Sequence, residues 1–559
     1  MSLTDRRTCG VGFYSIADKF LDDVVEAAQA LCEAEGSAIV SDSIATRALH
    51  AVEAGAAAAD TGVGGGVEAI AAGDGAGAAA EPVRVLGAFH MPRLTYDLAL
   101  RRFRELEGAG SLLGDAGAKT AAARDRLHLL QERMSMLPGL AKAALPTAPA
   151  GAGGSDGSVD IVTVQSLLGA GLGRKRYIMG ALSQPREGHF ALEDTTGTVP
   201  LDLSAAQTIE GDAALYTESC VVLLQGVMRA TDGVFEVQML GMPPLVTREE
   251  AAKAGHAVMG ASAAELSDRE ALAEAEKAAE ADMVVLLADV RLDDAAAVER
   301  LTKVLAGFEG AAADDAAAPT MFVLMGDFVG GESGAWGGAG GGGGGGSGEG
   351  SATAHASALA RRLGELGELL EAHPNLAARS HFVLVPGPGD PSPGSALPRP
   401  PLPDFVTARL TAIQARAKLS LTLATNPCRV RFYTQELVIH RTDLPVKMRR
   451  LAIRPPAEVE AMDEGEGGEA GPLFGLASTV LQQAYLSPLP LSAQPVYWDF
   501  DTSLRLHDSP DVLVLADGGA SGTCGVKETQ AINPGSLAAE GTFAVYLPAS
   551  RKVQLSAVE

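Results

Sequence analysis

Three apolar runs decide the fold: VVLLA at 284–288, MFVLM at 321–325 and HFVLV at 381–385. Helix-like spacing of apolar residues follows the first run at 294–308 and precedes the third at 354–372. Strands that alternate with helices predict a parallel sheet buried on both faces. Because sites in α/β folds lie where parallel strands end, the residues just after these runs are the first candidates for a functional site.

The runs are followed by turns that keep two carboxylates. Asp289 comes directly after the first run and Asp327 shortly after the second. Two-metal phosphoesterases carry D-x-H, G-D-x-x-D, G-N-H-[DE] and G-H-x-H at such strand ends, because a bridging carboxylate and further ligands must hold two cations. Asp289 and Asp327 match the carboxylates of the first two patterns.

The other positions of those patterns have lost their ligands. Arg291, a fixed cation that would repel a metal, stands at the histidine of D-x-H. At the third strand end, Pro388 replaces the asparagine and Gly389 the histidine that would act as general acid. After a fourth run, VLVL at 512–515, Asp517 and Gly519 replace the two histidines of G-H-x-H. We therefore expect no catalytic residue, metal or cofactor here.

Two alternatives stay open. Asp289, Asp327 and Asp517 are oxygen ligands that could converge on a single Mg²⁺ or Mn²⁺. Against it, the histidine nearest to these strand ends in sequence is His507, and an aspartate at a strand end commonly caps a turn. A cysteine nucleophile at Cys428, with Arg429 lowering its pKa, is a further alternative.

Composition limits the class of protein. The chain has 559 residues, five scattered cysteines without a CxxC pair, and a formal net charge of −26. This favours several domains with reduced thiols and opposes broad binding of phosphate backbones. The sequence has no uninterrupted apolar run of about 18 residues, so it predicts no membrane span. The following basic residues form a cluster that we interpret as a solvated or protein-facing surface: Arg429, Arg431, Arg441, Lys447, Arg449, Arg450 and Arg454.

The chain divides at its Gly- and Ala-rich segments. We predict a helical N-terminal region at 1–56, a linker at 57–82, a strand-helix segment at 83–145 leading to a barrel, and a linker at 146–157. The remaining segments are a barrel at 158–247 and an α/β domain at 248–559, with disordered insertions at 331–352 and 460–472.

The barrel prediction rests on five short β runs with turn signals between them, at 177–182, 189–193, 198–203, 220–228 and 234–239. Such spacing suits a small barrel of the OB type. A single-stranded DNA platform would need a basic groove and exposed aromatic rings. Four aromatic residues are available, Tyr177, Phe190, Tyr216 and Phe235, and acidic residues outnumber basic ones, so a protein-facing barrel is favoured.

Many short motifs, in order along the chain, carry a family resemblance. In the barrel they are FALEDTTGTVPLDL at 190–203, LYTESC at 215–220 and GMPP at 241–244. GAFHMPR at 87–93 precedes it, and VPGPGD at 385–390, LPRPPL at 397–402, TNPCR at 425–429, YTQE at 433–436, PLPL at 488–491, PVYW at 495–498 and INPGS at 532–536 follow. The chain resembles the second, non-catalytic subunit of DNA polymerase epsilon over about residues 83–550.

That resemblance implies an OB domain packed on an inactive calcineurin-like phosphoesterase domain. It implies a nuclear replication complex, with the C-terminal region of the catalytic subunit, the small histone-fold subunits and the GINS part of the helicase as partners. DNA would be met only within the complex, and no membrane is involved. Residues 1–56, which would dock the helicase, match the family pattern poorly.

Aromatic residues dominate interface hot spots, so Tyr433, Tyr497 and Trp498 are candidate anchors for these partners. Their alternative role is in the core.

Overall fold

A computed structural model of the chain describes residues 83–106, 108–137, 161–169, 173–208, 214–248, 250, 269–313, 318–330, 349–453 and 471–558. All of them belong to one compact unit, Glu68–Glu559. The predicted N-terminal region at 1–56 and the linkers at 57–82 and 146–157 lie outside the described residues. None of the described helices is both long enough and apolar enough to span a bilayer.

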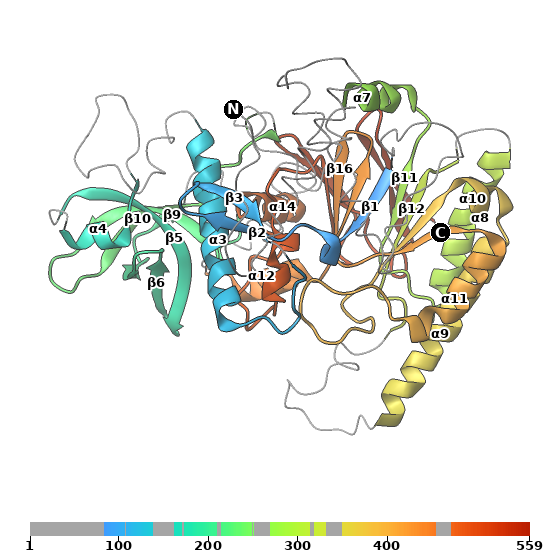
Figure 1. The fold of residues 1–559 in the computed structure, drawn as a ribbon, viewed down its shortest axis with the longest axis horizontal. Coiled ribbons are helices and arrows are strands. Elements are labelled where there is room, and N and C mark those ends of the chain that lie inside the picture. The colour runs from blue at the N-terminus through green and yellow to red at the C-terminus, as the bar shows by residue number, and fades with distance from the viewer. Residues whose placement is uncertain are drawn as a thin grey trace, which may run out of the picture. The chain divides into compact units, whose positions relative to one another are not determined.

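A closed barrel forms where five β runs predicted it (Figure 1). Its strands are β5 (Lys175–Arg186), β6 (His189–Glu193), β7 (Thr198–Asp202), β9 (Val221–Met228) and β10 (Phe235–Gly241). Pairing runs β5–β6–β7–β10–β9 and returns to β5. The short strands β4 (Ile161–Val162) and β8 (Gln207–Thr208) add to β5 and β10, and α4 (Val164–Gly169) follows β4. Ile178, Leu192 and Phe235 fill the interior.

The first of two large sheets contains the three apolar runs that decide the fold. Its order is β14 (Ser420–Leu423), β13 (His381–Val385), β12 (Met321–Met325), β11 (Val284–Leu287), β20 (Thr542–Leu547) and β21 (Lys552–Ala557). The first four strands are parallel, but β20 and β21 are antiparallel to their neighbours. The sheet is therefore mixed, because the last strands form a hairpin on the edge that the helix-connected strands leave open.

The second sheet has the order β1 (Val83–Gly87), β15 (Cys428–Phe432), β16 (Gln435–Arg441), β17 (Val512–Ala516), β19 (Thr529–Asn533) and β18 (Gly522–Val526). We expected 83–145 to lead into the barrel, whereas β1 pairs with β15. The strand joins this sheet because its alternate residues Val83 and Val85 are apolar and are buried between the two large sheets.

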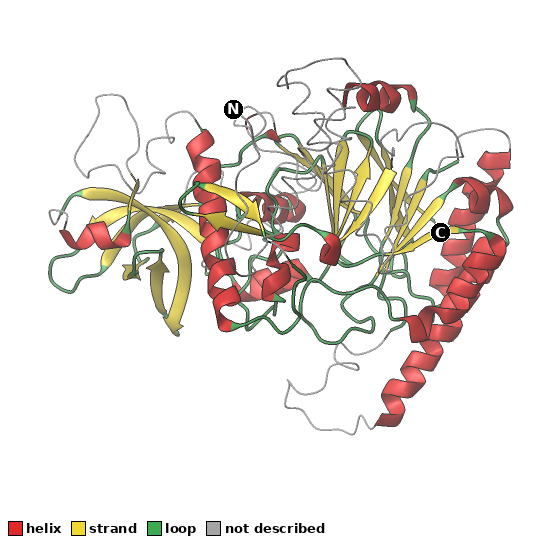
Figure 2. Cartoon of the chain, viewed as in Figure 1, coloured by secondary structure: helices red, strands yellow, loops and turns green. Residues whose placement is uncertain are grey.

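The two large sheets pack face to face, with helices on both outer faces (Figure 2). In the first sheet, Val284 and Leu286 face the second sheet, while Val285 and Leu287 face helices. Those helices are α8 (Ala295–Ala313), α9 (Glu349–Glu371), α10 (Pro374–Arg379) and α11 (Asp404–Ala417). Helices α12 (Leu444–Leu451) and α14 (Pro472–Gln482) cover the other sheet, and α7 (Arg269–Ala278) precedes β11.

The predicted insertions end earlier than expected. Helix α9 begins at Glu349 and α14 at Pro472, so residues 349–352 and residue 472 are helical. Pro472 lies in the first turn of α14, where its missing N–H costs no helical hydrogen bond. Residues 331–348 and 460–470 lie outside the described part of the chain.

A hairpin and one long helix join the barrel to the sheets. They are β2 (Leu94–Asp97), β3 (Arg102–Glu105) and α3 (Ala116–Met136), next to the short helices η1 (Ala88–His90) and η2 (Trp498–Leu504). Leu127, Leu130 and Met134 of α3 pack against Met179 and Val221 of the barrel. Gln483, which follows α14, accepts a hydrogen bond from the Val221 N–H and donates one to its carbonyl, each at 2.7 Å.

Candidate functional site

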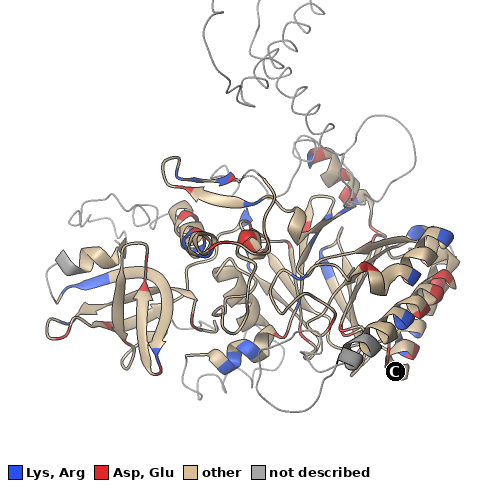
Figure 3. Ribbon diagram, turned by 60° about the horizontal axis from the view of Figure 1, so that its bottom comes forward, with Lys and Arg blue, Asp and Glu red and all other residues tan. Residues whose placement is uncertain are grey.

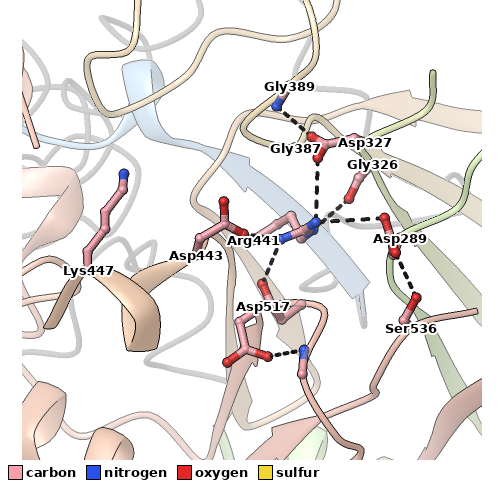
Figure 4. A network of polar contacts seen from close by, with 12 residues as sticks. Asp289, Gly326, Asp327, Gly387, Gly389, Arg441, Asp443, Lys447, Asp517 and Ser536 are labelled. Atoms are coloured by element: carbon pink, nitrogen blue, oxygen red, sulfur yellow. Dashed lines mark hydrogen bonds and ion pairs between the residues drawn. The ribbon is translucent and has the colours of Figure 1, made fainter. Parts of the chain in front are cut away.

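The ends of four parallel strands, two from each large sheet, meet at one place (Figure 4). Asp289 follows β11, Asp327 follows β12, Arg441 ends β16 and Asp517 follows β17. The parallel pairs β11–β12 and β16–β17 bring their carboxyl ends to the same edge of each sheet. The predicted positions Asp289, Arg291, Asp327 and Gly389 do come together here, and Arg441 joins them.

Arg441 occupies the centre of the group. Its side chain is 4% exposed and lies between the two carboxylates, with Nη2 3.9 Å from Asp289 Oδ1 and 3.6 Å from Asp327 Oδ2. Its Nε donates to the Gly326 carbonyl at 2.6 Å, and Nη1 donates to the Ala516 carbonyl at 3.4 Å. From the end of β16, this one side chain therefore reaches the ends of three other strands, β11, β12 and β17.

Asp289 is held by three neighbours. Besides Arg441, Arg291 Nε donates to Asp289 Oδ1 at 3.2 Å, and Ser536 Oγ donates to Oδ2 at 2.6 Å. Both carboxylate oxygens thus have partners from the protein. Arg291, which stands at the position predicted from the D-x-H pattern, here neutralises the Asp289 carboxylate.

The loop after β13 closes over Asp327. Gly389 N–H donates to Asp327 Oδ1 at 2.6 Å, and a Cβ at Gly389 would lie 3.1 Å from the Asp327 Cγ. A side chain at Gly389 would therefore press on the Asp327 carboxylate, which would have to shift by a few tenths of an ångström. Pro388 precedes this glycine in the same loop.

Asp390 fixes the base of the loop. Its carboxyl oxygens accept from the Phe328 N–H at 2.9 Å and the Gly387 N–H at 2.8 Å. Burial, with the charge of Asp327 nearby, raises the pKa of Asp390 to about 7. Asp390 was not among the predicted site residues, although it closes the motif VPGPGD.

Asp517 does not face the other two carboxylates. Its Oδ1 accepts from the Gly519 N–H at 2.8 Å and from Asn533 Nδ2 at 2.6 Å. The three-aspartate alternative therefore lacks its third ligand. Within the described ranges, no three His, Cys, Asp or Glu side chains gather closely enough to hold a metal.

The arrangement determines what chemistry is available. A guanidinium has a charge but no coordination position for water, so it cannot lower the pKa of a nucleophilic water as a metal does. What it can do is join strand ends through several hydrogen bonds at once. The site is therefore suited to structural support of the strand ends.

Other sequence candidates lie elsewhere. His507 packs edge-on against Phe103, with the ring centroids 4.8 Å apart, away from the strand ends. Burial raises the pKa of the Cys428 thiol to about 12, the opposite of what a nucleophile needs. Tyr216 and Phe235 of the barrel are fully buried in its core and offer no ring for base stacking.

The basic cluster predicted from the sequence is not one surface. Arg429 and Arg441 are both buried, and Arg429 Nη1 pairs with Glu436 Oε1 at 2.8 Å. That part of the interpretation is wrong, because each arginine meets a carboxylate that sequence spacing does not reveal. Figure 3 shows basic ribbon on α12 and mixed charges on the long helices α9 and α11, where Arg409 pairs with Glu368.

The three candidate anchors are half-buried. The Tyr433 hydroxyl donates to Asp282 Oδ2 at 3.2 Å and the ring packs against the core between the sheets. The Tyr497 N–H donates to the Leu397 carbonyl at 2.8 Å, and Trp498 begins η2. Their role as anchors stays a prediction.

Comparison with known proteins agrees with the motifs. The chain is 34% identical over 481 residues to the B subunit of DNA polymerase epsilon from Arabidopsis thaliana, covering 86% of this chain and 84% of that protein. The chain belongs to the family of the second, B-type subunits of DNA polymerase epsilon. It is also 32% identical over 486 residues to "DNA polymerase epsilon subunit 2" of Homo sapiens, covering 85% and 83%.

Two family models match separate parts of the chain, one around the barrel and one within the two large sheets. Residues 116–244 match "DNA polymerase epsilon subunit 2-like, OB-fold domain", and residues 284–523 match the family of the B subunits of DNA polymerases alpha and epsilon. The OB-fold match begins at the first residue of α3, which places this helix with the barrel in the family. A solved archaeal phosphodiesterase is 10% identical with a TM-score of 0.24, covering 49% of this chain and 99% of that one, a likeness too low to bear on function.

Proposed function

We propose that this chain is a non-catalytic subunit of DNA polymerase epsilon that serves as a rigid docking body. Membership of the B-type subunit family supports the assignment. The single observation that carries the mechanism is the position of Arg441 between Asp289 and Asp327. A cation supplied by the chain itself keeps the strand ends together without any metal.

The finer parts of the proposal concern fold class and partners. Two face-to-face mixed sheets with outer helices and altered ligand positions support an inactive phosphoesterase domain of the calcineurin-like type. The partner that we propose first is the C-terminal region of the polymerase's catalytic subunit, in the nucleus. Contacts with the histone-fold subunits and with GINS, and leading-strand replication, follow from the family resemblance.

A hydrolysis assay tests the non-catalytic part. The full-length chain is incubated with bis(p-nitrophenyl) phosphate and Mn²⁺, beside Asp289→Ala and Asp327→Ala. We expect the wild type and both variants to give the same background rate. Mn²⁺-dependent turnover that disappears in both variants would show a working site and overturn the proposal.

A co-purification assay tests the docking part. The chain and the C-terminal region of the catalytic subunit are co-expressed, and the complex is captured through the latter. We expect a stable complex that Tyr497→Ala/Trp498→Ala weakens, while Phe405→Ala on α11, 65% exposed, leaves it intact. Failure of the wild-type chain to co-purify would remove the functional assignment, whereas an intact complex in the double variant would remove only these anchors.

A further inference from the structure

The hairpin β2–β3 has one face fixed against the rest of the chain. Tyr96 pairs with Phe103 across the hairpin, and both rings point toward α3 and the residues beyond η2. Tyr96 stacks on His128 at 4.4 Å, and Phe103 meets His507 edge-on. The hairpin is thus a rigid element beside α3 (Figure 1).

One edge of this hairpin is also satisfied. On β2, the Leu94 N–H donates to Thr502 Oγ1 at 3.2 Å and the Tyr96 N–H donates to Asp125 Oδ1 at 3.1 Å. These backbone groups therefore point away from β3. In an antiparallel pair, two residues that lie opposite each other form either a hydrogen-bonded or a non-hydrogen-bonded pair. In a non-hydrogen-bonded pair, the N–H and C=O groups of both residues point away from the partner strand.

The other edge follows from the register. Phe103 lies opposite Tyr96, and Glu105 lies opposite Leu94. Their N–H and C=O groups consequently point outward along β3, and within the described residues β3 pairs with no strand other than β2. Such an edge is a template for one more strand.

The chemistry of this edge is mainly basic and apolar, with one exposed carboxylate, Glu105, at its far end. Arg101, Arg102 and Arg104 are exposed on β3 and the turn before it, in a chain of net charge −26. The turn also exposes Leu98 (64%) and Leu100 (56%).

The acidic residue of the turn is already used. Asp97 Oδ1 accepts from the N–H groups of Ala99 and Leu100, at 2.9 and 3.1 Å, and Oδ2 lies 3.4 Å from Arg104 Nε. Arg102 lies opposite Asp97 across the hairpin, and both Arg101 and Arg102 keep their guanidinium groups exposed. No ion pair of theirs is found among the described residues.

A hollow lies at the far end of β3. A cavity of about 250 Å³ is lined by Glu105, Leu106 and Phe500 together with the loop at 108–110 and residues 89–93. Phe89 and Phe500 pack edge-on at 4.8 Å in its wall. An extended segment lying along β3 would run from the apolar turn into this hollow.

We propose that the outer edge of β3 binds an extended acidic and apolar segment of a partner protein as an added strand. Backbone groups of Phe103 and Glu105 would bond the segment, and its carboxylates would face Arg102 and Arg104 as cross-strand neighbours. Apolar side chains of the segment would cover Leu98 and Leu100. This surface is independent of the strand ends around Arg441 and of the proposed role in the polymerase.

The test measures binding of a short fluorescent peptide of alternating glutamate and valine to the full-length chain, by anisotropy at low salt. We expect saturable binding, with at least about tenfold weaker binding of the matching lysine–valine peptide. Arg102→Glu/Arg104→Glu should weaken the acidic peptide by a similar factor, and Leu98→Ser/Leu100→Ser by about threefold. Added salt should weaken binding.

Two controls separate this edge from unspecific attraction. Lys552→Glu lies on β21, another edge strand, and should leave binding unchanged within about twofold. Hydrogen exchange of the wild-type chain should slow at Phe103 and Glu105 when the peptide is present. Absence of binding to the wild type, equal binding of the lysine peptide, equal loss in Lys552→Glu, or exchange protection elsewhere only would each overturn the proposal.

Discussion

A guanidinium differs from a divalent metal in ways that matter where the four strands end. Its charge is spread over a plane, and it is bound by hydrogen bonds and by the covalent chain, so it is never lost to solution. Arg441 also ends the strand β16 from which it reaches the neighbouring ends. Removing it would leave Asp289 and Asp327 facing each other without their shared cation.

We therefore expect Arg441→Ala to lower the free energy of unfolding by about 3–5 kcal/mol, because a buried ion pair is broken on one side only. Arg441→Ala/Asp289→Asn/Asp327→Asn should recover part of that loss. Urea unfolding followed by tryptophan fluorescence measures both. Arg409→Ala, which removes an exposed pair, is the control and should leave the midpoint unchanged. A neutral Arg441→Ala would mean that the guanidinium has no supporting role.

His440 of β16 should make the stability of the fold depend on pH. It is fully buried, and neither ring nitrogen has a hydrogen-bond partner among the described residues. Burial, with the charge of Lys447, lowers its pKa to about 3. In the unfolded chain the pKa is about 6.5, so the unfolded state takes up a proton first as pH falls. Stability should therefore decrease below pH 6.5 and continue to decrease down to about pH 3.

Between pH 7 and pH 5, the free energy of unfolding of the wild type should fall by about 2 kcal/mol more than that of His440→Phe. Urea midpoints at the two pH values measure it. His189→Phe on the exposed side of the barrel should keep the wild-type pH dependence. His381, whose pKa burial lowers to about 4, should account for part of the dependence that remains. Identical slopes for His440→Phe and the wild type would contradict the prediction.

Among the elements, α3 is a major connection between the barrel and the sheets, beside direct hydrogen bonds such as those of Gln483 to Val221. Arg133 near its end is buried and donates to the carbonyls of Leu481, Leu506 and His507, at 3.2, 2.5 and 3.2 Å. Two of these acceptors lie just before β17, and Leu481 lies in α14. Asp125, nearer the start of the same helix, lies 3.4 Å from the buried Arg505.

Arg133→Met keeps much of the apolar stem but removes three hydrogen bonds, two of them buried, to the carbonyls of Leu481, Leu506 and His507. We expect a loss of about 3 kcal/mol in stability and faster amide exchange throughout α3. Hydrogen exchange with mass spectrometry resolves the helix from the rest of the chain. The exposed Arg124→Met on the same helix should change neither quantity. Exchange that rises uniformly over the molecule would show that Arg133 supports global stability and has no special role in docking α3.

At the scale of the whole molecule, local patterns predicted the strands and missed the pairings between distant ones. The runs at 321–325 and 381–385 became β12 and β13 with the same bounds. A strand that is buried on both faces is a continuous apolar run, and such a run is visible in the local sequence. The pairing of β1 with β15 joins residues more than 300 positions apart, and no local period encodes it. The role of Arg441 was not predicted for the same reason: two of its carboxylate partners, Asp289 and Asp327, follow strands of the other sheet, so only three-dimensional proximity reveals them.

Both β1 and α3 precede residue 158, yet they complete the second sheet and cover the barrel. A fragment starting at residue 158 would contain both the barrel and the α/β domain as the sequence predicts them. In the structure, such a fragment loses β1 from the second sheet, and Met179 and Val221 lose the α3 side chains that cover them. It also exposes a sheet edge that β1 protects. We expect residues 158–559 to aggregate, whereas residues 83–559 should show the same cooperative thermal transition as the full chain. Size-exclusion chromatography and calorimetry of the two fragments measure this, and a monomeric, cooperatively melting 158–559 fragment would show that β1 and α3 are dispensable.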